Sequence, residues 1–203
     1  MVTYKGLPAP LICDFLSREV SRERYAHGTE FQIGRIDMVG NTGTYLDSPF
    51  HRYADGADLA DLQLAALADL ECLVVATGSE PRCIERLPLT PEAVRGRAVL
   101  VHTGWDRHWR TDQYFESHPH LSERLARWLV DAGAVLVGID SFNIDCTDTG
   151  ARPVHTVLLA ATIPIVEHLR GLEQLPARGA RFFAVPPKVR GFGTFPVRAF
   201  ALV

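Results

Sequence analysis

The segment from Asn41 to His51 contains the side chains best suited to chemistry in this chain. Asp47 and His51 lie four residues apart, and Pro49 between them stiffens the backbone. Tyr45 and Asp47 alternate, so in an extended strand both side chains face the same side. A carboxylate and an imidazole placed in this way can share a metal ion or act as an acid/base pair. A hydrogen-bonded turn without a catalytic role explains the same composition.

Two further ionisable residues, His155 and Glu167, lie twelve residues apart in the C-terminal part of the chain. Imidazole and carboxylate groups are both common metal ligands. Each residue also has an ordinary structural interpretation. His155 lies among apolar residues such as Val154 and Leu158, which suits a buried histidine, and Glu167 can pair with Arg170 on a helix surface. Spacing alone leaves both interpretations open.

Several other residues near the ends of apolar segments are weaker candidates. Trp105, with Trp109 and Phe115, can form an aromatic wall over a ligand, or a surface cluster or subunit contact. We expect His118-Pro119-His120 to be a solvated loop rather than a metal site. Three polar residues follow an apolar strand, where α/β proteins commonly bind ligands and where loop capping is the alternative: Asp140, Asn143 and Asp145.

Apolar runs and turn residues outline the elements that position these side chains. Predicted strands cover residues 11–15, 31–39, 72–77, 98–103, 134–139, 181–185 and 197–203. Helices are predicted to begin at Thr90-Pro91 and to cover 122–132, and the leucines between residues 59 and 70 have near-helical spacing. Residues 154–169 look helical, with a break near Ile163 because Pro164 cannot continue a helix. Buried strands with intervening helices predict an α/β fold.

Composition excludes several classes of protein. The 203 residues suit one domain, and 47% apolar with 22% charged residues is typical of a folded chain. A net charge of −3 provides no basic surface for nucleic acid. The four cysteines form no CxxC pair, and no stretch approaches the ~20 apolar residues of a membrane span. We therefore expect a cytoplasmic protein that acts on a small molecule, without a nucleic-acid or membrane partner.

The first segment resembles the signature of the cyclase family that includes bacterial kynurenine formamidase and isatin hydrolase. That signature is His-x-Gly-Thr-His-x-Asp-x-Pro-x-His, and the residues that match it in register are Gly43, Thr44, Asp47, Pro49 and His51. Other parts of the chain resemble the family in the same order: Thr103-Gly104-Trp105, Gly138-Ile139-Asp140-Ser141, His155 with Glu167, and residues 190–199. The resemblance extends from about Asp14 to Leu202. Several separated matches in order are more specific than any one of them.

The resemblance implies a single cyclase-like domain over residues 1–203. Its fold would be a β-rich core of mixed sheet flanked by helices, of the swivelling β/β/α type, in subunits that form homodimers or homotetramers with shared active sites. It also implies that His51 is the general acid/base and that Asp47, His155 and Glu167 hold any metal ion. Trp105 and Ser141 are expected to bind substrate.

The chain departs from the family signature at two positions. Asn41 and Tyr45 stand where the family has metal-binding histidines. An amide oxygen and a neutral phenol are poor ligands for zinc or manganese, which favour imidazole and carboxylate. We therefore expect a divalent ion on Asp47, His155 and Glu167 to be weakly held or absent, and we expect no organic cofactor. Asn41 and Tyr45 can instead donate hydrogen bonds to the substrate.

The leading functional hypothesis is hydrolysis of a C–N bond in a small amide, formamide or lactam, with His51, Asp47, Glu167 and Tyr45 as catalytic residues. One alternative is a metal-independent lyase, isomerase or cyclase in which His51 is the base. Proton transfer alone typically contributes ~10²–10⁴-fold, which suits activated substrates better than ordinary amides. A second alternative is a homologue that binds a small molecule without turnover.

Overall fold

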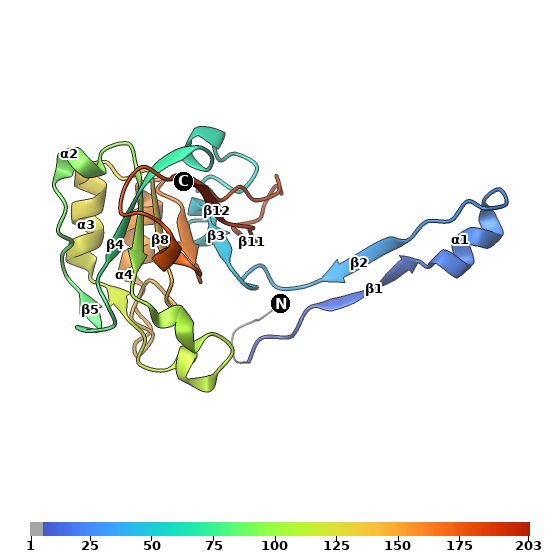
Figure 1. The fold of residues 1–203 in the computed structure, drawn as a ribbon, viewed down its shortest axis with the longest axis horizontal. Coiled ribbons are helices and arrows are strands. Elements are labelled where there is room, and N and C mark those ends of the chain that lie inside the picture. Colours follow the sequence, from blue (N-terminus) through green and yellow to red (C-terminus); the bar gives the residue numbers. More distant parts are fainter. Residues whose placement is uncertain (1–5) are drawn as a thin grey trace.

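The computed structural model describes residues 6–203 and is organised around an eight-stranded mixed sheet (Figure 1). The strand order is β11-β3-β9-β8-β6-β4-β10-β12, and the central strands β9, β8, β6 and β4 are parallel while the outer pairings are antiparallel. Their bounds are β3 Tyr45–Asp47, β4 Leu70–Ala76, β6 Ala98–His102, β8 Leu136–Ile139, β9 Ile165–Glu167, β10 Arg181–Phe183, β11 Thr194–Pro196 and β12 Phe200–Leu202. The predicted α/β fold with a mixed sheet and helices is confirmed.

Three α-helices cover one face of this sheet: α2 (Pro91–Val94), α3 (Glu123–Ala132) and α4 (Pro153–Ala160). Local signals fix their ends. The Ser122 hydroxyl accepts a hydrogen bond from the Leu125 backbone, and Gly133 ends α3 in the left-handed conformation. The apolar faces of α3 and α4 pack on β6 and β8. In β6, the residues from Val99 to Val101 are fully buried. A second apolar cluster fills the opposite face of the sheet.

Short elements connect these layers. Strands β5 (Cys83–Ile84) and β7 (His120–Leu121) pair with each other in a separate, parallel two-stranded sheet. Single 3₁₀ turns occupy Pro49–His51, Leu64–Ala66, Trp105–His108, Asp112–Phe115 and Leu172–Gln174. No helix within residues 6–203 is both long enough and apolar enough to span a lipid bilayer.

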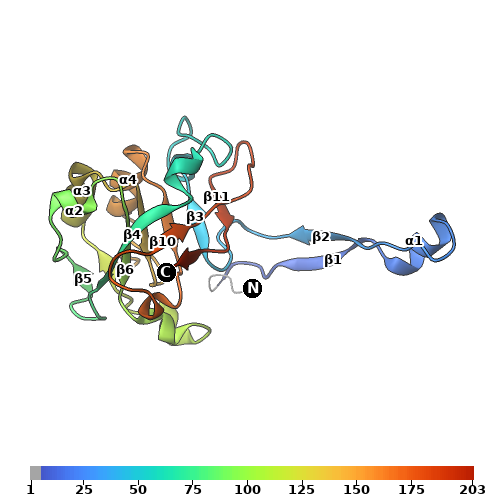
Figure 2. The same ribbon diagram turned by 45° about the horizontal axis from the view of Figure 1, so that its top comes forward.

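The N-terminal part of the described chain forms an arm that projects far from the body (Figures 1 and 2). Strands β1 (Leu11–Leu16) and β2 (Ile33–Asp37) pair with each other in an antiparallel ribbon, and helix α1 (Arg18–Arg24) lies near its tip. The arm exposes eight large apolar side chains: Leu11, Ile12, Phe15, Val20, Tyr25, Phe31, Ile33 and Ile36. A ribbon of two strands has little stability of its own in water, and exposed apolar surface of this kind is typical of interaction sites.

Three sequence predictions about secondary structure are wrong. The predicted helix over 154–169 ends at Ala160, and the chain then reverses through Thr162, which has a positive φ of 58°. The chain does break near Ile163, as Pro164 predicted, but strand β9 follows instead of more helix. Glu167 therefore lies in a buried strand and not on a helix surface. The leucines between residues 59 and 70 form only one 3₁₀ turn. Strands β3 and β11 were not predicted because each has three residues.

The prediction of a solvated loop at His118-Pro119-His120 is also wrong. His118 is fully buried and His120 is 8% exposed. The Nε2 atom of His118 lies 3.0 Å from the Thr147 hydroxyl, and His120 belongs to β7. Burial lowers the pKa of His118 to about 4, because the charged imidazolium loses its hydration.

We predict that His118 makes the protein sensitive to acid. Its folded-state pKa of about 4 lies below the value of 6.5 in the unfolded chain, so its contribution to stability is complete above pH 6.5 and is lost as the pH falls towards 4. The shift corresponds to about 3 kcal/mol of unfolding free energy. Urea unfolding of wild type and His118→Gln between pH 7.5 and 4 checks this. The prediction would be contradicted if the unfolding free energies of the two proteins changed equally with pH.

Candidate active site around a buried carboxylate

Strand register assembles the polar cluster at one end of the sheet. In the antiparallel pairing of β3 with β9, Tyr45 lies opposite Glu167. In the pairing of β3 with β11, Asp47 lies opposite Thr194. Directly opposed residues, and residues two apart along a strand, project to the same face. Four polar side chains from three strands therefore meet on the face that α4 covers.

The Asp47 carboxylate is the most deeply placed charge in this cluster, because its residue is completely buried. The Thr194 hydroxyl donates a hydrogen bond to Oδ1. The other oxygen, Oδ2, has no hydrogen-bond partner among residues 6–203 and lies 3.6 Å from His155 Nε2. A buried carboxylate with an unused oxygen is costly unless a positive charge or a metal ion faces it.

His51 follows β3 in a 3₁₀ turn and lies between Asp47 and solvent. Its Nδ1 is 2.7 Å from the Thr194 hydroxyl and 3.6 Å from Asp47 Oδ1. Because Thr194 gives its only proton to Asp47, Nδ1 of His51 is the donor to Thr194, and a neutral ring keeps its lone pair on Nε2. Gly193 permits this arrangement, since a Cβ there would lie 2.5 Å from the His51 backbone nitrogen.

His155 projects from the first turn of α4 and is held by Asp145. The Asp145 carboxylate accepts hydrogen bonds from the Val154 and His155 backbone and from His155 Nδ1, at 2.7, 3.0 and 2.7 Å. The second ring nitrogen, Nε2, therefore faces Asp47 and Glu167. Burial lowers the pKa of His155, but its hydrogen bond with Asp145 and the charges of Asp47 and Glu167 outweigh burial and raise the pKa to about 10.

Glu167 is occupied by donors from the protein. The Tyr45 hydroxyl donates to Oε2 at 2.6 Å, and the Ile144 backbone donates to Oε1 at 2.6 Å. Oε1 also lies 3.8 Å from His155 Nε2. Burial raises the pKa of Glu167 to about 7, because the attraction of His155 does not fully offset desolvation and the nearby charge of Asp47.

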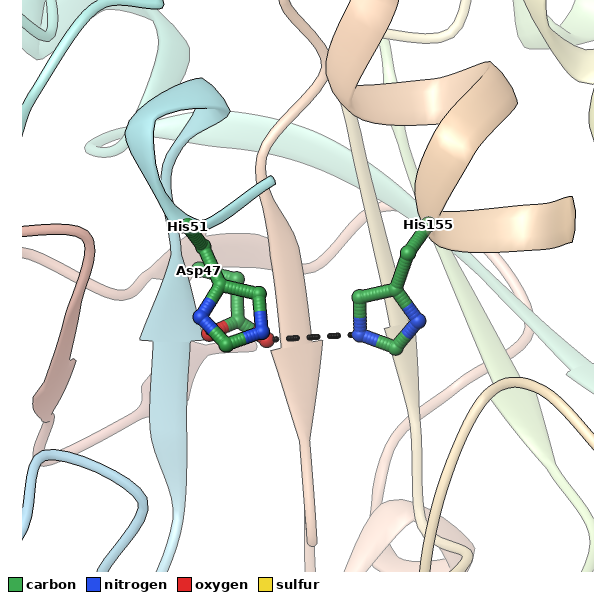
Figure 3. Close-up of side chains that lie close together, drawn as sticks. All are labelled: Asp47, His51 and His155. Carbon is green, nitrogen blue, oxygen red and sulfur yellow. Dashed lines mark ion pairs between the residues drawn. The ribbon is translucent and has the colours of Figure 1, made fainter. Parts of the chain in front are cut away.

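Three of these side chains converge closely enough to hold one metal ion. Ligand atoms of Asp47, His51 and His155 lie within 4.8 Å of one another, and Figure 3 shows the two rings and the carboxylate turned towards a common point. The unused Asp47 Oδ2 faces the same point. One carboxylate and two imidazoles suit a zinc or manganese ion with open positions. The set differs from the sequence prediction, since His51 takes part and the Glu167 oxygens are used by Tyr45 and Ile144.

A cavity of about 120 Å³ opens onto this cluster. Its lining consists of Asn41, Tyr45, His51, Arg52, Asn143, Arg152, His155 and Glu167. Two residues predicted to bind substrate lie outside this lining. Trp105 is buried and its indole donates to the Tyr114 carbonyl at 3.0 Å, while Ser141 is fully buried and its hydroxyl lies 3.4 Å from His118 Nδ1. A larger cavity of about 240 Å³ beside α3 contains none of the clustered groups.

A layer of buried rings supports Tyr45 from behind. The ring centroids of Tyr45 and His168 are 5.1 Å apart, and the Tyr114 hydroxyl lies 2.9 Å from His168 Nδ1. Burial lowers the pKa of His168 to about 3, so the ring is neutral at physiological pH. Trp109 packs edge-on against the same imidazole, with centroids 5.5 Å apart. Trp109 therefore packs against His168 and is not among the residues that line the cavity.

Sequence reasoning missed Thr194 and His168 and left Asp145 ambiguous. Thr194 had no signal, because only the pairing of β11 with β3 brings it beside Asp47. His168 lay next to Glu167 but inside a segment predicted as helical. Asp145 was considered as a loop cap, and it does cap α4, but its contact with the His155 ring depends on how that helix begins.

The mixed sheet and its carboxylate–imidazole cluster define an α/β protein with a cavity beside a group of residues that could hold a metal ion. Residues 15–146, more than half of the chain, match the family model described as "Putative cyclase". The chain belongs to the cyclase family.

Relatives of known name agree with this assignment. Kynurenine formamidase of Erythrobacter litoralis is 28% identical over 170 residues, which cover 82% of this chain and 74% of that protein. Kynurenine formamidase of Bacillus cereus is 27% identical over 184 residues, 90% of this chain and 85% of that protein. A solved structure of an isatin hydrolase bound to the product analogue thioisatinate superposes with a TM-score of 0.76 at 22% identity, covering 98% of this chain and 84% of that one.

We predict that Asp145 stabilises both α4 and the His155 ring. Asp145→Asn places an amide NH₂ group against donors that now face a carboxylate oxygen, so about 3 kcal/mol of unfolding free energy should be lost. The exposed Asp131→Asn is the matched control and should change stability by no more than about 0.5 kcal/mol. Chemical denaturation measures both. A loss at Asp145 no larger than that of the control would refute the role assigned here.

Proposed function

We propose that the protein hydrolyses a C–N bond of a small amide, formamide or lactam, in a site that holds one divalent ion on Asp47, His51 and His155. The convergence of these three side chains, two of which line a cavity, is the observation that carries the proposal. The relatives named kynurenine formamidase and isatin hydrolase support the same class of reaction.

Zinc or manganese suits this set of one oxygen and two nitrogen donors. Such an ion supplies Lewis-acid activation of a carbonyl group when it is bound. Thr194 orients both Asp47 and His51, and Asp145 orients His155 so that Nε2 faces the common point. Hydrogen bonds of this kind, made to the ligand side chains from the side away from the ion, keep a metal site preorganised.

Tyr45 and Glu167 form a hydrogen-bonded pair that can donate a proton into the cavity. The Tyr45 hydroxyl proton lies in the 2.6 Å hydrogen bond to Glu167 Oε2, and both residues line the cavity. Hydrolysis adds water to the carbonyl carbon and breaks the C–N bond, so the departing nitrogen needs one proton, and this pair can deliver it. Asn41, which also lines the cavity, can donate its amide hydrogens to a substrate oxygen.

A metal-independent lyase or isomerase is the second candidate, and a specific observation favours it. The His155 ring, with its pKa raised to about 10 by Asp145 and nearby carboxylates despite burial, supplies a positive charge beside Asp47. The imidazolium therefore supplies the positive charge that faces Asp47 without an ion. In that case His51 Nε2 acts as the base and Tyr45 as a hydrogen-bond donor to the developing anion.

Metal content separates these two candidates. We expect purified protein loaded with zinc or manganese to retain about one ion per chain after desalting, and Asp47→Asn to weaken ion binding by roughly 100-fold or more, because it replaces the only anionic ligand. Hydrolysis of formanilide should fall in parallel and should stop on treatment with a chelator. The exposed Asp61→Asn should retain the ion. Full activity in a metal-free preparation would favour the second candidate instead.

We also propose that the chain forms a homo-oligomer through its projecting arm, in the cytoplasm. The eight exposed apolar side chains of the arm lie on β1, β2, α1 and the segment between α1 and β2. The body of the same chain does not cover this arm (Figures 1 and 2). A specific interface buries about 800 Å² on each partner, which a ribbon of this kind can supply against a second copy. None of the four cysteines is in a disulfide, as suits a reducing compartment.

We predict that a charge on the arm dissociates the oligomer. Phe15, 76% exposed in the isolated chain, should be buried in the assembly, so Phe15→Glu should shift the molar mass towards that of one chain. His27→Glu, at the exposed tip of the arm, is the control for an added charge. Size-exclusion chromatography with light scattering measures the mass. A wild-type monomer, or a Phe15→Glu oligomer of unchanged mass, would contradict the proposed interface.

A further inference from the structure

Two arginines, Arg52 and Arg152, lie at the cavity that opens onto the buried cluster. A hydroxyl connects them: Arg52 Nε donates to Thr156 Oγ1 at 3.3 Å, and that hydroxyl donates to the Arg152 carbonyl at 2.7 Å. The first arginine follows His51 in the chain and the second precedes α4. Both arginines therefore line one cavity and come from the segments that also carry His51 and His155.

Neither guanidinium has a carboxylate partner within ion-pair distance in the part of the chain that the structure describes. Arg52 is exposed and its Nε contacts only the neutral Thr156 hydroxyl, while its Tyr53 neighbour lies under the guanidinium at 5.4 Å. Arg152 is half-buried, and one of its nitrogens, Nη1, donates to backbone carbonyls. Those carbonyls fix the plane of the Arg152 guanidinium and leave its remaining edge for a ligand.

Charge therefore varies with depth in this cavity. Buried Glu167 and His155 line the cavity, with Asp47 3.6 Å from the His155 ring. The exposed Arg52 and the half-buried Arg152 instead carry positive charges without a carboxylate counter-ion among residues 6–203. Like charges held close together are unfavourable unless an anion comes between them. Arginine forks bind carboxylates through paired, charge-assisted hydrogen bonds, which are stronger than neutral ones.

We propose that Arg52 and Arg152 form a subsite for a carboxylate group of the substrate. The proposal rests on the proposed function and narrows it: the substrate is a small amide or formamide that bears a carboxylate beyond the scissile bond. The carboxylate binds at the rim, and the C–N bond then lies deeper, towards Tyr45 and the Asp47 cluster. The subsite selects substrates by charge and takes no part in bond cleavage.

The test compares two probes of the same shape, 2-formamidobenzoate and its neutral carboxamide 2-formamidobenzamide. Wild type should prefer the carboxylate by roughly 10- to 100-fold in kcat/KM, as expected for one charge-assisted pair. In Arg52→Gln that preference should fall towards one, mainly through a higher KM for the carboxylate. Arg152→Lys, which keeps the charge but loses the planar fork, should lower it partly. The exposed Arg178→Gln removes the same charge away from the cavity and should keep the wild-type preference.

Binding of the product-like 2-aminobenzoate, measured by calorimetry, separates this proposal from the proposed function. If wild type binds 2-aminobenzoate and Arg52→Gln does not, but neither formamide is hydrolysed, the carboxylate subsite stands and the hydrolase proposal fails. If both formamides are hydrolysed equally and Arg52→Gln binds 2-aminobenzoate as tightly as wild type does, the subsite is disproved. The subsite is also disproved if wild type neither binds the carboxylate nor prefers it.

Discussion

The burial of the Asp47 carboxylate is the constraint on which the site depends. Strands β11 and β9 enclose β3 on both edges, and α4 covers its polar face, so the charge cannot reach water. Thr194 satisfies one oxygen, while the other faces His155 without a hydrogen bond. A fold that places a charge in this way must compensate it with a cation, either the imidazolium of His155 or a metal ion.

Tyr45 shows how the chain can differ from its family signature and still bring three possible metal ligands together. Its hydroxyl occupies one oxygen of Glu167, its ring packs on the neutral His168, and both contacts are buried. Glu167 is thereby satisfied within the protein, and the donors left to face a common ion are Asp47, His51 and His155. Tyr45 thus occupies Glu167, and the three remaining donors are held by their own hydrogen bonds from Thr194 and Asp145.

The sequence was sufficient for the central part of the fold and for the identity of the main polar residues. Strands β4, β6 and β8 were predicted because a continuous apolar run is a strong signal. Strands β3, β9 and β11 carry the site, yet each has three residues and gives no periodicity. Their register alone brings Thr194 to Asp47 and Tyr45 to Glu167. A local pattern cannot contain that information. The residues after Pro164 were predicted to be helical, but a proline can precede a strand as well as end a helix.

The central claim is that one cation site lies between Asp47, His51 and His155. Anomalous diffraction from crystals grown with zinc tests it most directly. We expect one strong peak within bonding distance of a carboxylate oxygen of Asp47 and of a ring nitrogen of each histidine, at about 2.0–2.2 Å. A fully occupied ion elsewhere, for example between His118 and His120, with no peak at Asp47, would contradict the account.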